Sequence, residues 1–325
     1  MASEQLAGGA RPFGATGLLV SRMGYGAMEL SGAPRARDLS EAFVARFLND
    51  LVDRGVNYID TSIDYGLSEI LIGKSLAHRR SDFILASKCA CEVGVEHPAR
   101  GERHTYTGAN VIAGVEQSLR RMRTDHLDVV QVHGDPTRAE LETGGVAEAL
   151  VSLKQRGLIR FSGLSSRLPK LAEFVDADWL DVIQVPWSAL QRTNEDVISA
   201  LKRAGKAIVA RGVAGRGAPA KDWATRPIGT ADGEVRGVWE RAGLDDLLGG
   251  MSRIEFMIRF AFANPDIDVA LVATTDMAHL AADVEIANRG PLPADVYDAA
   301  RTRLRAAGAV PGQGEYVGGG PSIVV

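Results

Sequence analysis

The chain has 325 residues, of which 46% are hydrophobic and 24% are charged, and its formal net charge is −4. This composition is typical of a globular protein, and the charge gives no basis for nucleic-acid binding. No apolar run reaches the ~20 residues of a membrane-spanning helix, and residues 1–14 contain no apolar signal core. Cys89 and Cys91 are too closely spaced for an unstrained disulfide and too few for a structural zinc site. We therefore expect reduced thiols in a cytoplasmic protein.

Along the chain, residues 1–10 are expected to be disordered and residues 11–21 to form a β-hairpin that turns between Gly14 and Gly17. A regular alternation of short apolar runs and amphipathic helices follows. Ser40 and Thr107 are predicted to cap two of these helices. The predicted strands cover residues 23–27, 56–59, 83–86, 127–132, 158–164, 182–185, 207–210 and 269–273.

Eight strands that alternate with helices favour a parallel sheet closed into a (β/α)8 TIM barrel, an α/β fold, with the chain 1–325 as a single domain. A doubly wound open sheet is the structural alternative, but no glycine fingerprint follows the first strand. Residues 214–250 form a long insertion that contains Trp223 and Trp239, and a further helix follows Pro291. Residues 308–325 are rich in glycine, which suggests a loop over the active-site face.

Four polar residues lie where chemistry is expected in such a barrel, at or just after the carboxyl ends of the strands. Asp60, Lys88 and His133 end three successive strands, and Tyr65 follows Asp60 on a loop. A buried ammonium beside a phenol stabilises the phenolate, so Tyr65 can donate and recover a proton. A neutral His133 can hydrogen-bond a substrate oxygen. The chain has no nucleophile elbow and no predicted metal site, so the bond-making electrons must come from another molecule.

These residues lie in motifs that resemble the aldo-keto reductase family. The resemblance runs through RPFGATGLLVSRMGYGAM, GVNYIDTSIDYGLSEILIGKSL, LASK, QSLRRMRTDHLDVVQVH, GLSS and VIQVPWSALQR. It implies a catalytic tetrad of Asp60, Tyr65, Lys88 and His133, in which Tyr65 is the general acid. It also implies that a hydride comes from NADP(H), bound without a Rossmann fold.

The resemblance further implies the cofactor contacts. Ser165, Ser166 and Gln184 would hold the nicotinamide amide, although the family often has asparagine at the position of Ser166. Arg211 stands where a tyrosine usually stacks on the ring, and a guanidinium plane can also stack there. The other implied contacts around the ring are Gly26, Ala27, Met28, Asp60 and Gly212.

The implied phosphate pocket departs from the family pattern. Its segment reads LVATTDMAHLAADVE, in which Thr274 and Thr275 can still donate to a 2′-phosphate. His279 stands where many members carry arginine, and Asp283 stands where many carry asparagine for the adenine. Arginine is the usual partner of a 2′-phosphate, and without it the predicted pocket carries less positive charge. NADP(H) is therefore the first cofactor expected, and use of NAD(H) stays open.

The predicted function is NAD(P)H-dependent reduction of an aldehyde or ketone to an alcohol. Three alternatives stay open: a sugar or alcohol dehydrogenase, a cofactor-binding regulatory subunit with little turnover, and a slow biosynthetic enzyme. The predicted partner is a small carbonyl compound, or a hydroxylated one because the loop 134–145 carries Asp135, Arg138 and Glu140. No nucleic acid or membrane partner is expected, and the oligomeric state is not predicted. Trp187 is expected to pack in the core and His104 to have no role.

Overall fold

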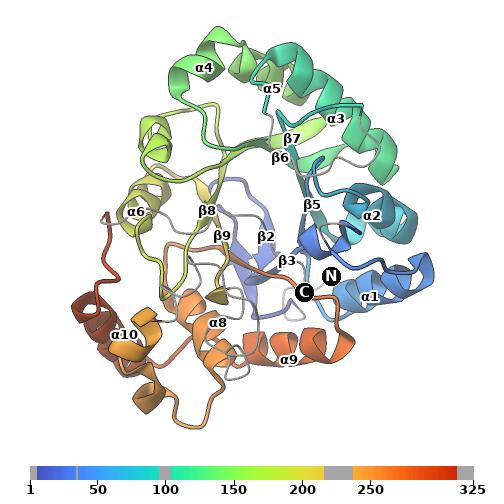
Figure 1. The fold of residues 1–325 in the computed structure, drawn as a ribbon. Helices are drawn as coiled ribbons and strands as arrows, with labels where there is room; N and C mark the ends of the chain where they lie inside the picture. Colours follow the sequence, from blue (N-terminus) through green and yellow to red (C-terminus); the bar gives the residue numbers. More distant parts are fainter. Residues whose placement is uncertain (1–5, 34–35, 95–103, 216–236, 313–325) are drawn as a thin grey trace.

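The computed structural model describes residues 6–33, 36–94, 104–215 and 237–312. Eight parallel strands close into a barrel in the order β10-β3-β4-β5-β6-β7-β8-β9, and helices surround it (Figure 1). The predicted (β/α)8 fold is therefore confirmed, and the open sheet is excluded. The barrel strands are β3 (Met23–Gly26), β4 (Tyr58–Asp60), β5 (Ile84–Cys89), β6 (Leu127–His133), β7 (Ile159–Ser165), β8 (Val182–Pro186), β9 (Ala207–Arg211) and β10 (Val269–Val272).

The helices lie outside the barrel, and each buries apolar side chains against the strands or against neighbouring helices. The predicted caps are present: Ser40 Oγ accepts from Phe43 N at 3.2 Å, and Thr107 Oγ1 accepts from Asn110 N at 3.3 Å. The α-helices are α1 (Glu41–Asp53), α2 (Ser68–Leu76), α3 (Gly108–Met122), α4 (Arg138–Thr143), α5 (Val146–Gln155), α6 (Glu195–Arg203), α8 (Arg253–Ala263), α9 (Met277–Asn288) and α10 (Ala294–Ala306). Short 3-10 helices are η2 (Ala27–Leu30), η3 (Ala77–Asp82), η4 (Lys170–Phe174) and η7 (Leu244–Leu247).

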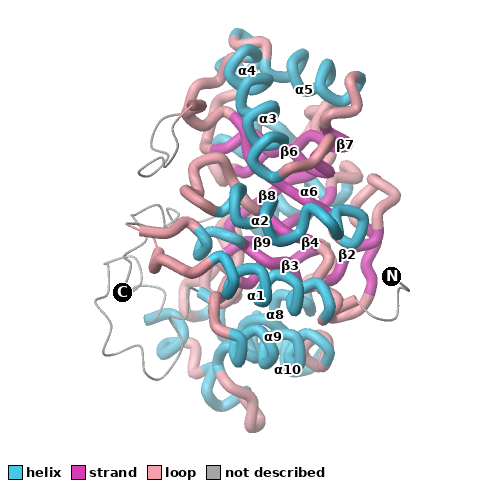
Figure 2. Tube along the Cα trace, turned by 90° about the vertical axis from the view of Figure 1, so that its right-hand side faces the viewer, coloured by secondary structure: helices cyan, strands magenta, loops and turns pink. Residues whose placement is uncertain are grey.

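The predicted hairpin consists of β1 (Ala10–Pro12) and β2 (Leu19–Ser21), and Figure 2 shows β2 at one end of the barrel. Its Phe13 is fully buried and packs against Tyr58 inside the barrel, with the ring centroids 5.4 Å apart. The expected disorder of residues 1–10 is wrong for residues 6–10, since Ala7 is buried and its N–H donates to Gly55 O at 2.9 Å. Residues 1–5 lie outside the described part.

Two tryptophans that the sequence places in loops belong to the core. Trp187 is 1% exposed and stacks on Phe260 at 5.7 Å, as predicted. Trp239 is also 1% exposed and lies edge-on to Phe256 at 5.6 Å, so it packs against α8 and does not line a substrate loop. Trp223 lies outside the described residues.

The C-terminal segment begins against the face that carries the strand ends. Gly312 N donates to Thr193 O at 2.9 Å, on the loop between β8 and α6. The rest of the predicted loop, from residue 313 on, lies outside the described part. Among the described helices, none combines the length and the apolar character that a bilayer crossing requires.

Candidate active site

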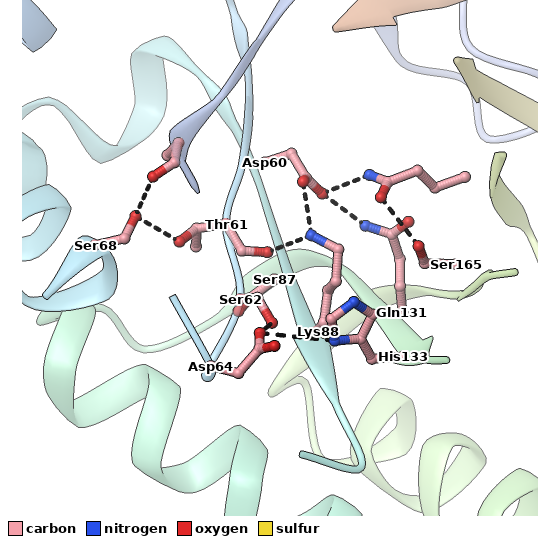
Figure 3. Close-up of polar contacts among 12 residues, drawn as sticks. Asp60, Thr61, Ser62, Asp64, Ser68, Ser87, Lys88, Gln131, His133 and Ser165 are labelled. Carbon is pink, nitrogen blue, oxygen red and sulfur yellow. Dashed lines mark hydrogen bonds and ion pairs between the residues drawn. The ribbon is translucent and has the colours of Figure 1, made fainter. Parts of the chain in front are cut away.

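Asp60 and Lys88 form a buried ion pair at the mouth of the barrel. Parallel pairing of β4 with β5 brings Asp60 opposite Ala86, and both charged side chains are almost completely buried. Lys88 Nζ donates to Asp60 Oδ2 at 2.7 Å and to Thr61 O at 2.8 Å (Figure 3). Burial by itself would lower the pKa of Lys88, but the negative groups around it, Asp60 first, outweigh burial and raise this pKa. Lys88 therefore stays an ammonium.

The second oxygen of Asp60 accepts two amide donors. Gln184 Nε2 donates to Asp60 Oδ1 at 2.7 Å and Gln131 Nε2 donates at 2.9 Å. The side-chain oxygen of Gln184 in turn accepts from Ser165 Oγ at 3.0 Å. Our sequence interpretation gave Gln131 no role. A polar amide within the apolar strand β6 is the sequence feature that could have identified it. Asp60 thus connects the ammonium of Lys88 with Gln184 and, through Gln184, with Ser165. Both of these residues are predicted to bind the nicotinamide.

Tyr65 lies over this ion pair. Lys88 Nζ is 4.7 Å from the centroid of the Tyr65 ring, and the His133 ring lies edge-on to it at 6.4 Å. The loop that carries Tyr65 is closed by Ser68 N, which donates to Tyr65 O at 2.8 Å. The structure therefore brings the predicted carboxylate, ammonium, phenol and imidazole into one cluster.

His133 has three neighbours that the sequence analysis did not assign to it. Cys91 Sγ lies 3.3 Å from His133 Nδ1, and Asp64 Oδ1 lies 3.6 Å from the same nitrogen. His104, predicted to have no role, lies edge-on to His133 with ring centroids 5.0 Å apart. Asp64 is held by a hydrogen bond from Ser62 Oγ. These contacts fix the orientation of the imidazole.

The surroundings of His133 also keep its imidazole neutral. Desolvation is the largest effect and lowers the pKa of His133 well below its ordinary value of about 6.5. The negative charge of Asp64 opposes this shift, while the positive charges of Lys88 and Arg211 add to it. At neutral pH His133 can therefore act as a hydrogen-bond donor or acceptor without carrying charge.

The residues predicted around the nicotinamide lie at the same mouth. Gly26 ends β3 and is paired with Asp60, and Arg211 ends β9. Gly212 follows in the left-handed region, at φ +74°, with open space where a side chain would begin. Ala27 and Met28 belong to the short helix η2.

Other predicted residues are engaged with protein groups. Ser166 Oγ donates to Asp135 Oδ1 at 3.0 Å, which turns this hydroxyl toward the loop after β6. Glu140 closes a capping box with Thr137 at the start of α4. Arg138 pairs with Glu142 and Asp176 on the surface. Arg138 and Glu140 therefore give no support to the expected hydroxylated substrate.

The predicted phosphate pocket lies between β10 and the start of α9. Thr274 and Thr275 follow β10, and Tyr25 Oη donates to Thr274 O at 3.1 Å. His279 is exposed in the first turn of α9. Asp283, one turn further, is 8% exposed, and desolvation raises its pKa to about 6 against the lowering effect of His279.

A cation that the sequence analysis missed lies beside these threonines. Arg37 Nη2 donates to Thr275 O at 3.1 Å and to Thr275 Oγ1 at 3.2 Å. Arg37 is exposed and comes from the loop before α1, so no local pattern relates it to residues after β10. A guanidinium with two threonine hydroxyls is a donor set suited to a phosphate. The donor set therefore fits a phosphate of a nicotinamide cofactor.

Comparison with known proteins agrees with this geometry. The profile of the Aldo/keto reductase family matches residues 22–302. The chain belongs to the aldo-keto reductase family. It is therefore an oxidoreductase that acts on carbonyl compounds with a nicotinamide cofactor.

Individual proteins match large parts of the chain. The uncharacterized oxidoreductase YqkF of Bacillus subtilis is 26% identical over 292 residues, which span 86% of this chain and 90% of YqkF. The holo form of the aldo-keto reductase AKR11C1 from Bacillus halodurans superposes with a TM-score of 0.77 at 27% identity, over 92% of this chain and 95% of that one. The NADH-specific methylglyoxal reductase of Escherichia coli is 27% identical over 204 residues, 59% of this chain and 63% of that protein.

Proposed function

We propose that this aldo-keto reductase reduces a small aldehyde or ketone to an alcohol, with Tyr65 as the general acid and NADPH as the preferred hydride donor. The observation that carries the proposal is the position of Lys88 Nζ, 4.7 Å from the Tyr65 ring centroid and 2.7 Å from Asp60 Oδ2. A buried, charge-paired ammonium beside a phenol is suited to stabilise the anion that the phenol becomes when it gives up its proton.

The bound cofactor supplies a hydride for the carbonyl carbon. Neutral His133 orients the carbonyl oxygen by a hydrogen bond, and Tyr65 transfers its hydroxyl proton to this oxygen as negative charge develops there. Lys88 stabilises the phenolate that remains. Asp60 holds Lys88 in place through the direct ion pair, and Gln131 and Gln184 fix the other oxygen of Asp60. Tyr65 recovers a proton from solvent before the next turnover.

The preference for NADPH is supported by Arg37. This guanidinium supplies a full positive charge beside Thr275, whereas His279 places an exposed imidazole where many members carry arginine. The neighbouring Asp276 carboxylate would oppose a phosphate, but it accepts from Ala278 N and His279 N as the N-cap of α9. The NADH-specific E. coli relative makes NADH the second candidate donor.

The substrate is proposed to be a short carbonyl compound. The E. coli relative is a methylglyoxal reductase by name, which makes a small aldehyde a reasonable first substrate to test. The reverse reaction, alcohol oxidation, would use the same residues. The two thiols, Cys89 and Cys91, are free and buried, which supports a cytoplasmic location where thiols stay reduced.

The proposal is tested by separating binding from turnover. NADPH and NADH binding are titrated by fluorescence, and oxidation of the tighter cofactor is followed with a panel of aldehydes and ketones that includes methylglyoxal. We expect Tyr65→Phe to lower kcat by about 10²-fold or more, with the cofactor Kd unchanged. Tyr297→Phe, in α10 and packed against Phe260, is the control. Unchanged turnover of Tyr65→Phe would refute Tyr65 as the acid.

A further inference from the structure

Three side chains with metal-binding atoms meet beside the proposed active site. Cys91, His104 and His133 each offer one ligand atom, and these atoms all lie within 4.8 Å of one another. Cys91 Sγ and His133 Nδ1 are 3.3 Å apart. The sequence analysis expected no metal site, because two thiols are too few for a structural zinc site, and it gave His104 no role.

The backbone around Cys91 and His104 holds the two residues opposite each other. They form an isolated antiparallel bridge, which places their side chains on the same side. Thr105 N donates to Ala90 O at 2.8 Å, next to this bridge. Ala90 has φ +67°, a left-handed conformation that a non-glycine residue seldom adopts. The chain thus turns sharply just before Cys91, and the turned conformation directs Cys91 toward His133.

The ring of His104 carries an independent sign of a missing partner. Its Nε2 atom is buried, and no hydrogen-bond partner for it exists among the residues that the structure describes. A buried ring nitrogen without a partner costs free energy unless a ligand or an ion satisfies it. His104 Nδ1 lies on the side of Gly134, where a β-carbon would come within 3.1 Å of it.

The ligand set matches zinc. Zn²⁺ takes thiolate and imidazole ligands in a tetrahedron, at about 2.3 Å from sulfur and 2.0–2.1 Å from nitrogen. In that tetrahedron a sulfur and a nitrogen ligand lie roughly 3.5 Å apart, close to the distance between Cys91 Sγ and His133 Nδ1. Asp64 Oδ1, 3.6 Å from the same nitrogen, offers a carboxylate for the fourth position or for charge balance. Two cations face His133, Lys88 and Arg211, and Lys88 is paired with Asp60.

We propose that Cys91, His104 and His133 form a binding site for one Zn²⁺ ion, or for another divalent metal that prefers sulfur and nitrogen ligands. On binding, the Cys91 thiol releases its proton to solvent, and the sulfur and the two ring nitrogens donate their lone pairs to the metal. A metal at Nδ1 of His133 leaves the proton of this ring on Nε2. The site would then fix the tautomer of the residue that, in the proposed function, donates to the carbonyl oxygen.

The test uses Co²⁺ as a spectroscopic probe and the untagged full-length protein, since a histidine tag binds the same metals. We expect one equivalent of Co²⁺ to give a thiolate-to-cobalt charge-transfer band and the visible bands of a tetrahedral site, and one equivalent of Zn²⁺ to remove them. Cys91→Ser should abolish the charge-transfer band, and His104→Gln should weaken metal binding about tenfold or more. Cys89→Ala and His126→Gln are the matched controls, and both variants should keep the charge-transfer band and the metal affinity of the parent protein.

Folding is checked by circular dichroism and by cofactor binding, and His104→Gln carries the test alone if Cys91→Ser fails either check. Absence of the charge-transfer band in the parent protein would overturn the proposal. A band that survives in Cys91→Ser, or affinity that is unchanged in His104→Gln, would also overturn it, because the metal would then bind elsewhere. This readout needs no turnover, so a failure of the metal site is distinguishable from a failure of the proposed reductase function.

Discussion

Gln184 Nε2 donates to Asp60 Oδ1 over 2.7 Å, so a residue expected to bind the nicotinamide and the carboxylate that holds Lys88 belong to one hydrogen-bond network. Asp60 uses its other oxygen for Lys88. In a buried site, such a network orients every member, and removal of one member leaves others unsatisfied. The Lys88 ammonium beside Tyr65 and the amide of Gln184 are therefore coupled through a single side chain, that of Asp60.

The ion pair predicts an asymmetry between its two partners. Asp60→Asn removes the negative charge that balances the buried Lys88 ammonium, so we expect a loss of about 3–5 kcal/mol in the free energy of unfolding. Lys88→Met should cost less, because Asp60 keeps amide donors from Gln131 and Gln184. The double variant should recover part of the stability of Asp60→Asn but no turnover. Denaturant unfolding and kcat measure both effects, and a reversed order of the single variants would contradict the network.

The loop that carries Tyr65 depends on Gly66. Gly66 has φ +47°, and a β-carbon there would overlap the Ser31 carbonyl oxygen. We expect Gly66→Ala to shift this loop and lower kcat about tenfold or more, since misplacement of a proton donor is costly. Gly157→Ala is the matched control, because Gly157 has φ +72° but open space around its α-carbon. Equal kcat values for the two variants would show that the loop does not position Tyr65.

Arg37 is expected to discriminate between the two cofactors. Loss of a charge-assisted contact to phosphate is worth about 1.5–3 kcal/mol, so Arg37→Ala should raise the Kd of NADPH roughly 10- to 100-fold. The Kd of NADH, which lacks the 2′-phosphate, should change little. Arg54→Ala, which removes another exposed arginine near the end of α1, serves as the control. Parallel losses of affinity for NADPH and NADH would place Arg37 away from the 2′-phosphate.

Asp283 makes the stability of the protein depend on pH. Its folded-state pKa of about 6 lies above the ordinary value of about 3.9, so the folded chain holds a proton that the unfolded chain has lost between these values. Stability therefore falls as the pH rises through this window. Asp283→Asn removes the effect and should stabilise the protein by about 2–3 kcal/mol above pH 6, with the difference vanishing toward pH 4.

The measurement is thermal unfolding of parent and variant across this pH range. Glu285→Gln, at an exposed position of the same helix, controls for the loss of one negative charge. A gain in stability that is independent of pH would show that the buried charge of Asp283 does not destabilise the folded protein.

The sequence by itself determined the barrel and one residue at the end of each of three successive strands. Runs of apolar residues report which segments are buried on both faces, and capping residues report where helices begin. Both signals depend only on neighbouring residues in the sequence, so they can be recognised without knowledge of the fold. Asp60, Lys88 and His133 were identified because a charge or an imidazole that follows an apolar strand is conspicuous.

Only the tertiary structure decided which side chains meet. Asp60 and Gln184 are 124 residues apart, and Arg37 and Thr275 are 238 residues apart. Barrel closure and the paths of the loops bring such pairs together, and neither produces a periodic pattern of residues that could be recognised in the sequence. The same holds for the contact of His104 with His133. The segment 6–10 was misjudged for this reason too, since whether a terminus is buried depends on the element that it packs against.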